Sequence, residues 1–131
     1  MSEPAGVPPT AVEPPELTVT IDAADPEALA VFWAAALGYD RAGAADSYVA
    51  LVPPGRPGPN VLLQRVPEPK TVKNRVHLDL KVPDIAATVA RLQALGARRT
   101  SEVIEELGSC WIVMADPEGN EFCVCDGQGG C

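Results

Sequence analysis

Residues 17–38, LTVTIDAADPEALAVFWAAALG, and residues 76–96, VHLDLKVPDIAATVARLQALG, repeat one pattern that decides the fold. Each begins as an alternating strand, passes an aspartate and continues as an alanine-rich helix that ends at Leu-Gly. Superposing Asp25 on Asp84 places Thr18 opposite His77. A spacing of about sixty residues is longer than the period of solenoid repeats. The sequence therefore predicts one duplicated module.

The local signals predict the same order of elements in both halves. Asp25 can cap a helix that has Pro26 at its first position, and Gly38 suits a left-handed stop. Further strands are predicted at 47–52, 61–66, 102–108, 109–116 and 121–125, while 43–46 and the proline-rich 53–60 are predicted to be loops at the mouth of a cup. The expected fold is α+β, with two tandem βαβββ modules that form a cup-shaped mixed sheet.

The predicted domain spans residues 17–125, with module one at 17–66 and module two at 76–125. Residues 1–16 hold five prolines and few large apolar side chains, so they are predicted to be a disordered tail. Residues 126–131 are predicted to be a flexible tail.

Composition excludes several classes of protein. The net charge of −8 argues against a nucleic-acid partner, which would need clustered lysine and arginine. The sequence has no apolar run near the ~20 residues of a membrane span, and it begins without a secretory leader pattern. A cytoplasmic protein without a membrane partner is expected.

Strand alternation predicts which side chains line the cup. If the aliphatic side chains pack on the helices, the polar side chains of the same strands face the opposite way. Gln64 and Cys123 are predicted to face inward from the strands that close each module. The first strands of the two modules contribute Thr18, Thr20, Asp22, His77, Asp79 and Lys81.

The duplicated plan, the segments DPEALAVFWAAALG and HLDLKVPD, and the closing DPEGNEFCV resemble the vicinal oxygen chelate superfamily. This superfamily contains glyoxalases, bleomycin-resistance proteins and extradiol dioxygenases. The sequence looks closest to glyoxalase-like proteins of actinobacterial type. The resemblance covers about residues 17–125, and it implies a homodimer, because dimers are common among such proteins.

In metal-dependent members of that superfamily, four inward side chains bind one divalent ion. By position, the resemblance places these sites at Thr18, Gln64, His77 and Cys123. Only His77 has the expected residue type, and the set offers no charged oxygen ligand for a hard ion. No metal or other cofactor is expected. If an ion is bound, the resemblance assigns it to His77, Gln64 and Cys123.

The cysteines and aromatic residues leave several interpretations open. Cys123 and Cys125 could form a zinc site with His77 and Cys110, or Cys123 could be a nucleophile activated by His77. Trp111, together with Tyr48, could form an aromatic wall for a flat ligand or belong to the core.

We expect a protein that binds a small organic ligand and whose metal site is degenerate, with sequestration of or resistance to a toxic compound as one such role. The alternative is a metal-dependent lyase, isomerase or thiol transferase that uses Zn, Ni, Mn or Fe in the cup. A third possibility is a regulatory module that binds another protein. The expected ligand-binding residues are His77, Asp79, Gln64, Thr18, Thr20, Cys123 and Trp111.

Overall fold

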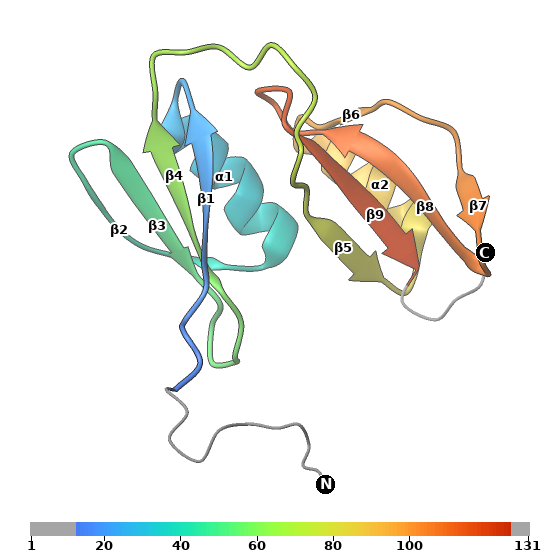
Figure 1. Cartoon of the computed structure of the whole chain (residues 1–131), viewed down its shortest axis with the longest axis horizontal. Coiled ribbons are helices and arrows are strands. Elements are labelled where there is room, and N and C mark those ends of the chain that lie inside the picture. Colours follow the sequence, from blue (N-terminus) through green and yellow to red (C-terminus); the bar gives the residue numbers. More distant parts are fainter. Residues whose placement is uncertain (1–12, 127–131) are drawn as a thin grey trace, which may run out of the picture.

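A computed structural model describes residues 13–126 of the protein, so most of the predicted tails lie outside the described residues. The two modules follow one another along the chain (Figure 1). Module one contains β1 (Thr18–Ala23), α1 (Pro26–Leu37), β2 (Asp40–Ala45), β3 (Tyr48–Val52) and β4 (Asn60–Arg65). Module two contains β5 (Asp79–Val82), α2 (Ile85–Ala94), β6 (Arg98–Arg99), β7 (Ile104–Glu106), β8 (Ser109–Ala115) and β9 (Glu121–Asp126).

The strands form one mixed sheet in each module. The order is β1-β4-β3-β2 in module one and β5-β9-β8-β6 in module two, where β7 also pairs with β8. The first and last strands of each module are parallel neighbours, and the other pairs are antiparallel. The predicted α+β fold with duplicated βαβββ modules is confirmed. In module two, the strand after the helix is split into β6 and β7.

Both helices begin as the sequence predicts. The carboxylate of Asp25 accepts a hydrogen bond from Ala28 N at 3.2 Å, and that of Asp84 accepts one from Ala87 N at 3.0 Å. These contacts satisfy amide groups that the first helical turn leaves without a partner. Gly38 ends α1 with φ of 68°, a left-handed conformation that glycine adopts without strain. Within residues 13–126, neither helix has the length and apolar character that a membrane crossing needs.

The prediction of a loop at residues 43–46 is wrong for most of that segment. Residues 40–45 form β2, an edge strand that pairs with β3 and has an irregularity between Arg41 and Gly43. Its sequence, DRAGAA, is rich in residue types that are depleted in strands. The pairing with the apolar strand β3 therefore outweighs the weak local preference.

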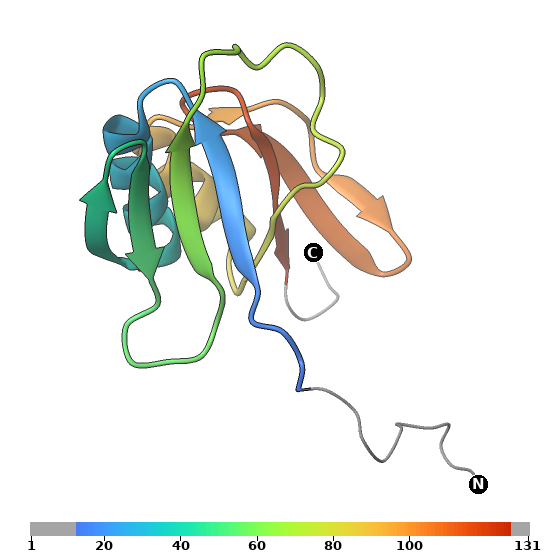
Figure 2. The same ribbon diagram turned by 60° about the vertical axis from the view of Figure 1, so that its left-hand side comes forward.

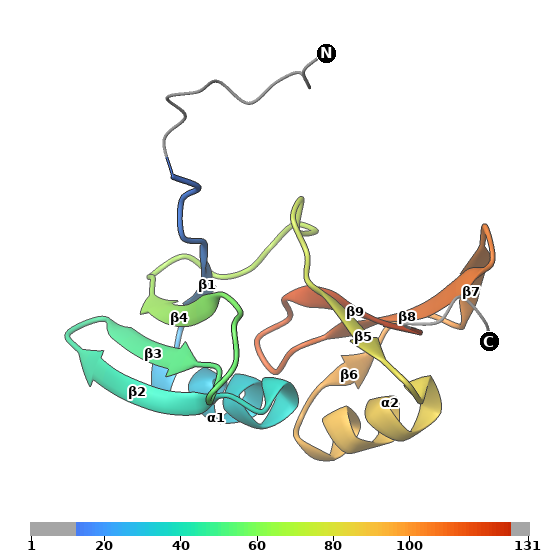
Figure 3. The same ribbon diagram turned by 90° about the horizontal axis from the view of Figure 1, so that it is seen from below.

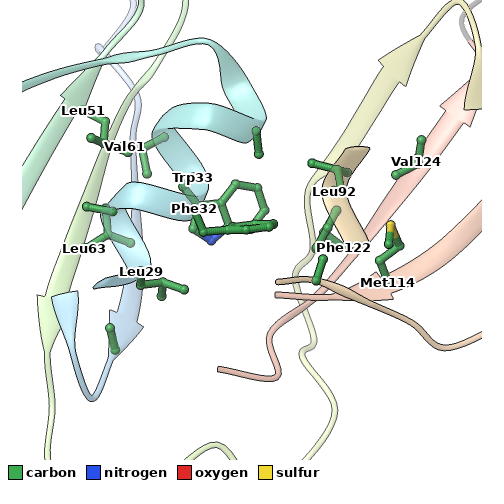
Figure 4. Close-up of a cluster of buried hydrophobic side chains, with 14 of the residues drawn as sticks. Leu29, Phe32, Trp33, Leu51, Val61, Leu63, Leu92, Met114, Phe122 and Val124 are labelled. Atoms are coloured by element: carbon green, nitrogen blue, oxygen red, sulfur yellow. The ribbon is translucent and has the colours of Figure 1, made fainter. Parts of the chain in front are cut away.

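The core lies between each sheet and its helix. Leu51, Val61 and Leu63 pack against α1 in module one, and Leu92, Met114 and Val124 pack together in module two (Figure 4). Trp33 of α1 and Phe122 of β9 join the two clusters, with ring centroids 5.0 Å apart in an edge-to-face arrangement. This geometry suits the charge distribution of aromatic rings.

Polar contacts reinforce this junction between the modules. Asp116, which is 1% exposed, accepts a hydrogen bond from Trp33 Nε1 at 2.9 Å. The carboxylate of Glu118 accepts hydrogen bonds from the backbone of Ala24 at 2.6 Å and of Asp25 at 2.9 Å. The turn at residues 116–120 in module two therefore holds the start of α1 in module one.

The helices lie on one side of the molecule, and the linker at residues 66–78 lies on the other (Figure 3). Arg91 of α2 donates hydrogen bonds to the carbonyl oxygens of Ala35 and Ala36, which places the two helices side by side. The linker leaves the end of β4, loops over the molecule and descends to β5 (Figure 2). Within residues 13–126, no helix covers the surface of either sheet that is turned away from α1 and α2 (Figure 3).

Candidate functional site

The sheet of module two has one face packed on α2 and one that is open. Leu80, Ile112 and Val124 belong to the core, so the alternate residues of the same strands face away from α2. The strand register pairs Asp79 with Cys123 and then Val113, and it pairs Lys81 with Cys125 and then Trp111. We call this set of six residues the open face of module two.

A pocket of about 560 Å³ lies on the open face of module two. Its size is within the range of small-molecule sites. His77, from the end of the linker, stands at its border. The pocket is lined by Lys73, His77, Asp79, Lys81, Ser109, Trp111, Val113, Glu121, Phe122, Cys123, Cys125 and Asp126.

His77 is held by Asp79. The imidazole Nδ1 lies 3.1 Å from Asp79 Oδ1, and both side chains are partly exposed. Because the carboxylate accepts, Nδ1 carries a proton and donates. The other ring nitrogen, Nε2, is then an acceptor when the ring is neutral and a donor when the ring is protonated. His77 can therefore present Nε2 to a ligand in a fixed orientation.

The thiol groups beside His77 stay protonated near neutral pH. Burial, followed by the negative charge of Asp79, raises the pKa of Cys123 to about 11. The same two causes raise the pKa of Cys125. The Sγ atom of Cys123 lies 3.9 Å from His77 Nδ1, which is already engaged with Asp79. Since the nucleophilic form of cysteine is the thiolate, these surroundings do not support a nucleophilic role for Cys123.

Glu121 holds the linker that carries His77. Its carboxylate accepts a hydrogen bond from Asn74 N at 2.9 Å and lies 3.1 Å from Lys70 Nζ. The Asn74 hydrogen bond is the largest cause that lowers the pKa of Glu121, and Lys70 acts in the same direction although burial opposes both. Lys70 also donates to the carbonyl oxygen of Val72. The charge of Glu121 is thus neutralised within the linker.

A second pocket, of about 620 Å³, lies between the modules. The edge of β1 forms one wall, residues of the linker form the other, and Trp33 and Phe122 are also part of the lining. Thr20 and His77 both border this pocket, so His77 stands where the two pockets adjoin.

The structure brings together only part of the predicted ligand-binding set. His77, Asp79, Cys123 and Trp111 line the pocket on module two, and Thr20 shares the intermodule pocket with His77. Thr18 borders a separate hollow beside Gly58 and Asn60. Gln64 lies in the sheet of module one between Asp22 and Tyr48.

The aromatic wall and the four-residue zinc site are not formed within the described chain. Tyr48 belongs to the sheet of module one, whereas Trp111 lies on the open face of module two, outside the apolar core. Cys110 is buried and lines a hollow beside α2, on the side of the sheet opposite to His77.

The ligand positions implied by the resemblance are divided between the modules, with Thr18 and Gln64 in the sheet of module one and Cys123 in that of module two. Among the described residues, one group could hold a metal ion: His77, Asp79 and Cys123, whose ligand atoms lie within 4.8 Å of one another. This group contains Asp79, whereas the set implied by the resemblance contains Gln64. One nitrogen, one oxygen and one sulfur donor suit zinc better than magnesium or manganese. These three residues fit a soft divalent ion with an open coordination position.

Some site residues were not singled out from the sequence. Lys73 and Val113 line the pocket, and neither belongs to the ligand-binding set expected from the sequence. Counting alternate positions along residues 109–115 would have placed Val113 on the same face as Trp111. No local signal shows that the linker returns Lys73 to this face.

Comparisons with known proteins agree on the fold. The family described as "Glyoxalase-like domain" matches residues 18–125. No curated protein matches the chain. Similar solved structures include a glyoxalase/bleomycin resistance protein/dioxygenase family enzyme from Burkholderia phytofirmans, with a TM-score of 0.70 and 17% identity over 83% of this chain and 95% of that one.

Two further structures carry the same description. The protein from Sphaerobacter thermophilus has a TM-score of 0.66 and 20% identity, with 87% of this chain and 98% of that one covered. The protein from Nocardioides has a TM-score of 0.67 and 20% identity, with 89% of this chain and 86% of that one covered. At these identities the likeness concerns the fold.

Proposed function

Because the chain belongs to the glyoxalase-like family of the vicinal oxygen chelate superfamily, we propose that it binds a small organic ligand on the open face of module two and sequesters it. The observation that carries this proposal is the position of Trp111. Its indole is only partly buried, lies outside the core and lines a pocket together with His77. Aromatic surface beside a few polar groups is typical of small-molecule sites.

The chemistry around Trp111 favours binding over turnover. The thiol of Cys123 is protonated, and the carboxylates of Asp79 and Glu121 are engaged by His77 and by the linker. The side chains that remain available include an indole, an imidazole Nε2, the ammonium groups of Lys73 and Lys81, and apolar surface. These groups hold a ligand without an evident nucleophile.

Binding can be measured by tryptophan fluorescence and thermal shift with a library of aromatic natural products. Trp33 is 1% exposed, so a ligand that quenches emission acts mainly on Trp111. Trp111→Phe should reduce the quenching while the protein stays folded. A library in which no compound raises the melting temperature or changes the emission would contradict the proposal.

We also propose a homodimer in which a second copy packs on exposed apolar surface outside the pocket that contains Trp111. This is supported by exposed apolar side chains such as Tyr48 and Leu107. Light scattering at micromolar concentration should give twice the mass of one chain. The proposal includes a cytoplasmic location, which cell fractionation would test.

A metal-dependent lyase, isomerase or thiol transferase is the second candidate, favoured by the cluster of His77, Asp79 and Cys123. Such an ion would supply Lewis-acid chemistry, and His77 and Asp79 would be expected to hold it together with the thiolate of Cys123. Elemental analysis after desalting separates the candidates. A stoichiometric divalent ion that is lost in His77→Ala, but retained in the matched control Cys125→Ser, would favour the enzyme and overturn the sequestration proposal.

A further inference from the structure

We propose that the ligand of module two is a flat organic anion, with an aromatic body on Trp111 and a carboxylate or sulfonate group held by Lys81 and Lys73. This inference rests on the proposed function and names the chemical class of its ligand. It follows from which charged side chains of the pocket already have protein partners and from the spacing of the strands.

The acidic side chains of the pocket have partners. Glu121 binds Lys70 and Asn74, and Asp79 lies against His77. Asp126 accepts a hydrogen bond from Cys110 N at 3.2 Å, among other contacts. Each carboxylate of the pocket therefore already has at least one partner within the protein.

The two lysines of the pocket are different. Within residues 13–126, neither Lys73 nor Lys81 has a hydrogen bond or an ion pair. Their charges nevertheless act on the open face of module two. Burial and the negative charge of Asp79 raise the pKa of both thiols, whereas Lys73 works to lower the pKa of Cys123 and Lys81 works to lower that of Cys125. The ammonium groups that lack protein partners thus lie close to the floor of the pocket.

No charged side chain lies between Lys81 and Trp111 in the strand register. Lys81, Cys125 and Trp111 form one row across β5, β9 and β8. Adjacent strands are about 4.8 Å apart, so the ends of this row are separated by roughly 10 Å. Because both thiols stay protonated, the surface between the ends is weakly polar. A molecule with two fused rings and one acidic group spans this row.

The net charge of −8 does not oppose this assignment at contact distance. At physiological salt the field of distant charges is screened within about 8 Å. The negative chain slows the approach of an anion, but two nearby ammonium groups decide the interaction at the site. The affinity should therefore rise on moving from low salt to moderate salt and fall again at high salt.

The test uses the full chain and three probes that share one ring system: 2-naphthoate, the neutral 2-naphthalenemethanol and the cationic 2-naphthylmethylamine. Isothermal titration at moderate salt should rank 2-naphthoate as the tightest. Lys81→Gln and Lys73→Gln should each weaken 2-naphthoate about five-fold, as expected for one partly exposed ion pair. Both variants should leave the neutral probe unchanged.

Arg98→Gln is the matched control. Arg98 is exposed on β6 and lines neither of the two pockets described above, yet its loss changes the net charge by the same amount as the loss of a lysine. Its affinity for 2-naphthoate should equal that of the unmodified chain. A five-fold loss in this control would show a general charge effect and overturn the inference.

The other outcomes separate the two proposals. If the neutral or the cationic probe binds as tightly as 2-naphthoate, the inference that the ligand is an anion is wrong. The proposal that module two binds a small organic ligand would still hold. If none of the three probes binds, the inference and the proposed ligand site both fail.

Discussion

The two modules share a backbone plan but present different chemistry on their open sheet faces. Equivalent positions carry Thr18, Thr20 and Asp22 in module one, whereas module two has His77, Asp79 and Lys81. Only the second set lies beside a pocket that also holds an indole and two thiols. The duplicated strands therefore fix where side chains point, and the side chains themselves decide which module can recognise a ligand.

The largest expected effect concerns the junction that keeps the modules in one arrangement. Asp116→Ala should lower the free energy of unfolding by about 3 kcal/mol, because it leaves Trp33 Nε1 and buried backbone amides without their acceptor. Urea unfolding followed by circular dichroism measures this loss. Glu105→Ala, at an exposed position, is the control. A loss below 1 kcal/mol would show that Asp116 contributes little to the junction beside the aromatic contacts and the hydrogen bonds of Glu118 and Arg91.

The next prediction compares one aromatic residue on each open face. Trp111→Ala should weaken binding of 2-naphthoate about ten-fold, since the stacking surface is lost. Tyr48→Ala, in module one, should leave the affinity within two-fold. Titration calorimetry of both variants gives the answer. Equal losses would mean that the two faces act together, as they would in a dimer that closes one module over the other.

Thr18 and His77, at equivalent positions, offer a finer comparison. His77→Ala should weaken the same ligand about five-fold, the usual effect of losing one hydrogen bond. Thr18→Ala should have no effect, because Thr18 borders a different hollow. An unchanged affinity in His77→Ala would show that the imidazole does not contact the ligand.

The smallest predicted effect concerns the contacts between the linker and Glu121 of module two. The folded state lowers the pKa of Glu121, so its stabilising contribution is present above the unfolded value of about 4.5 and is lost as the pH falls below it. Glu121→Gln should lower the free energy of unfolding by under about 1 kcal/mol at pH 7.

Urea unfolding between pH 7 and pH 3 checks this prediction. The difference between the unmodified chain and Glu121→Gln should shrink below about pH 4.5. The exposed control Glu105→Gln should show little difference at any pH. A difference that stays constant down to pH 3 would mean that the carboxylate charge of Glu121 contributes nothing.

Much of the fold could be predicted because its signals are local. Asp25 and Asp84 cap the helices, and Gly38 ends α1, as the residue types indicate. Residues 40–45 could not be identified as a strand, because the pairing with β3 is a tertiary contact. The strand expected to include His77 begins at Asp79 instead, so the imidazole is placed by the linker as well as by β5.

The candidate site could be predicted only within each module. Alternation predicts that Asp79 and Cys123 both face inward, and the structure pairs these two residues in the register of β5 and β9. Alternation says nothing about how one sheet faces another. Thr18 and Gln64 were therefore grouped with His77 by resemblance, whereas in the described chain they lie on a different sheet.

The turn at residues 116–120 has a consequence for the evolution of the chain. Its carboxylates reach from the second half to the first, but the equivalent stretch of the first half, within PPGRPGPN, has no acidic residue with which to reciprocate. The two halves are thus no longer interchangeable. A protein assembled from two copies of residues 17–66 would lack the carboxylate contacts that orient one module on the other. Each half of the present chain therefore depends on the other half for its arrangement.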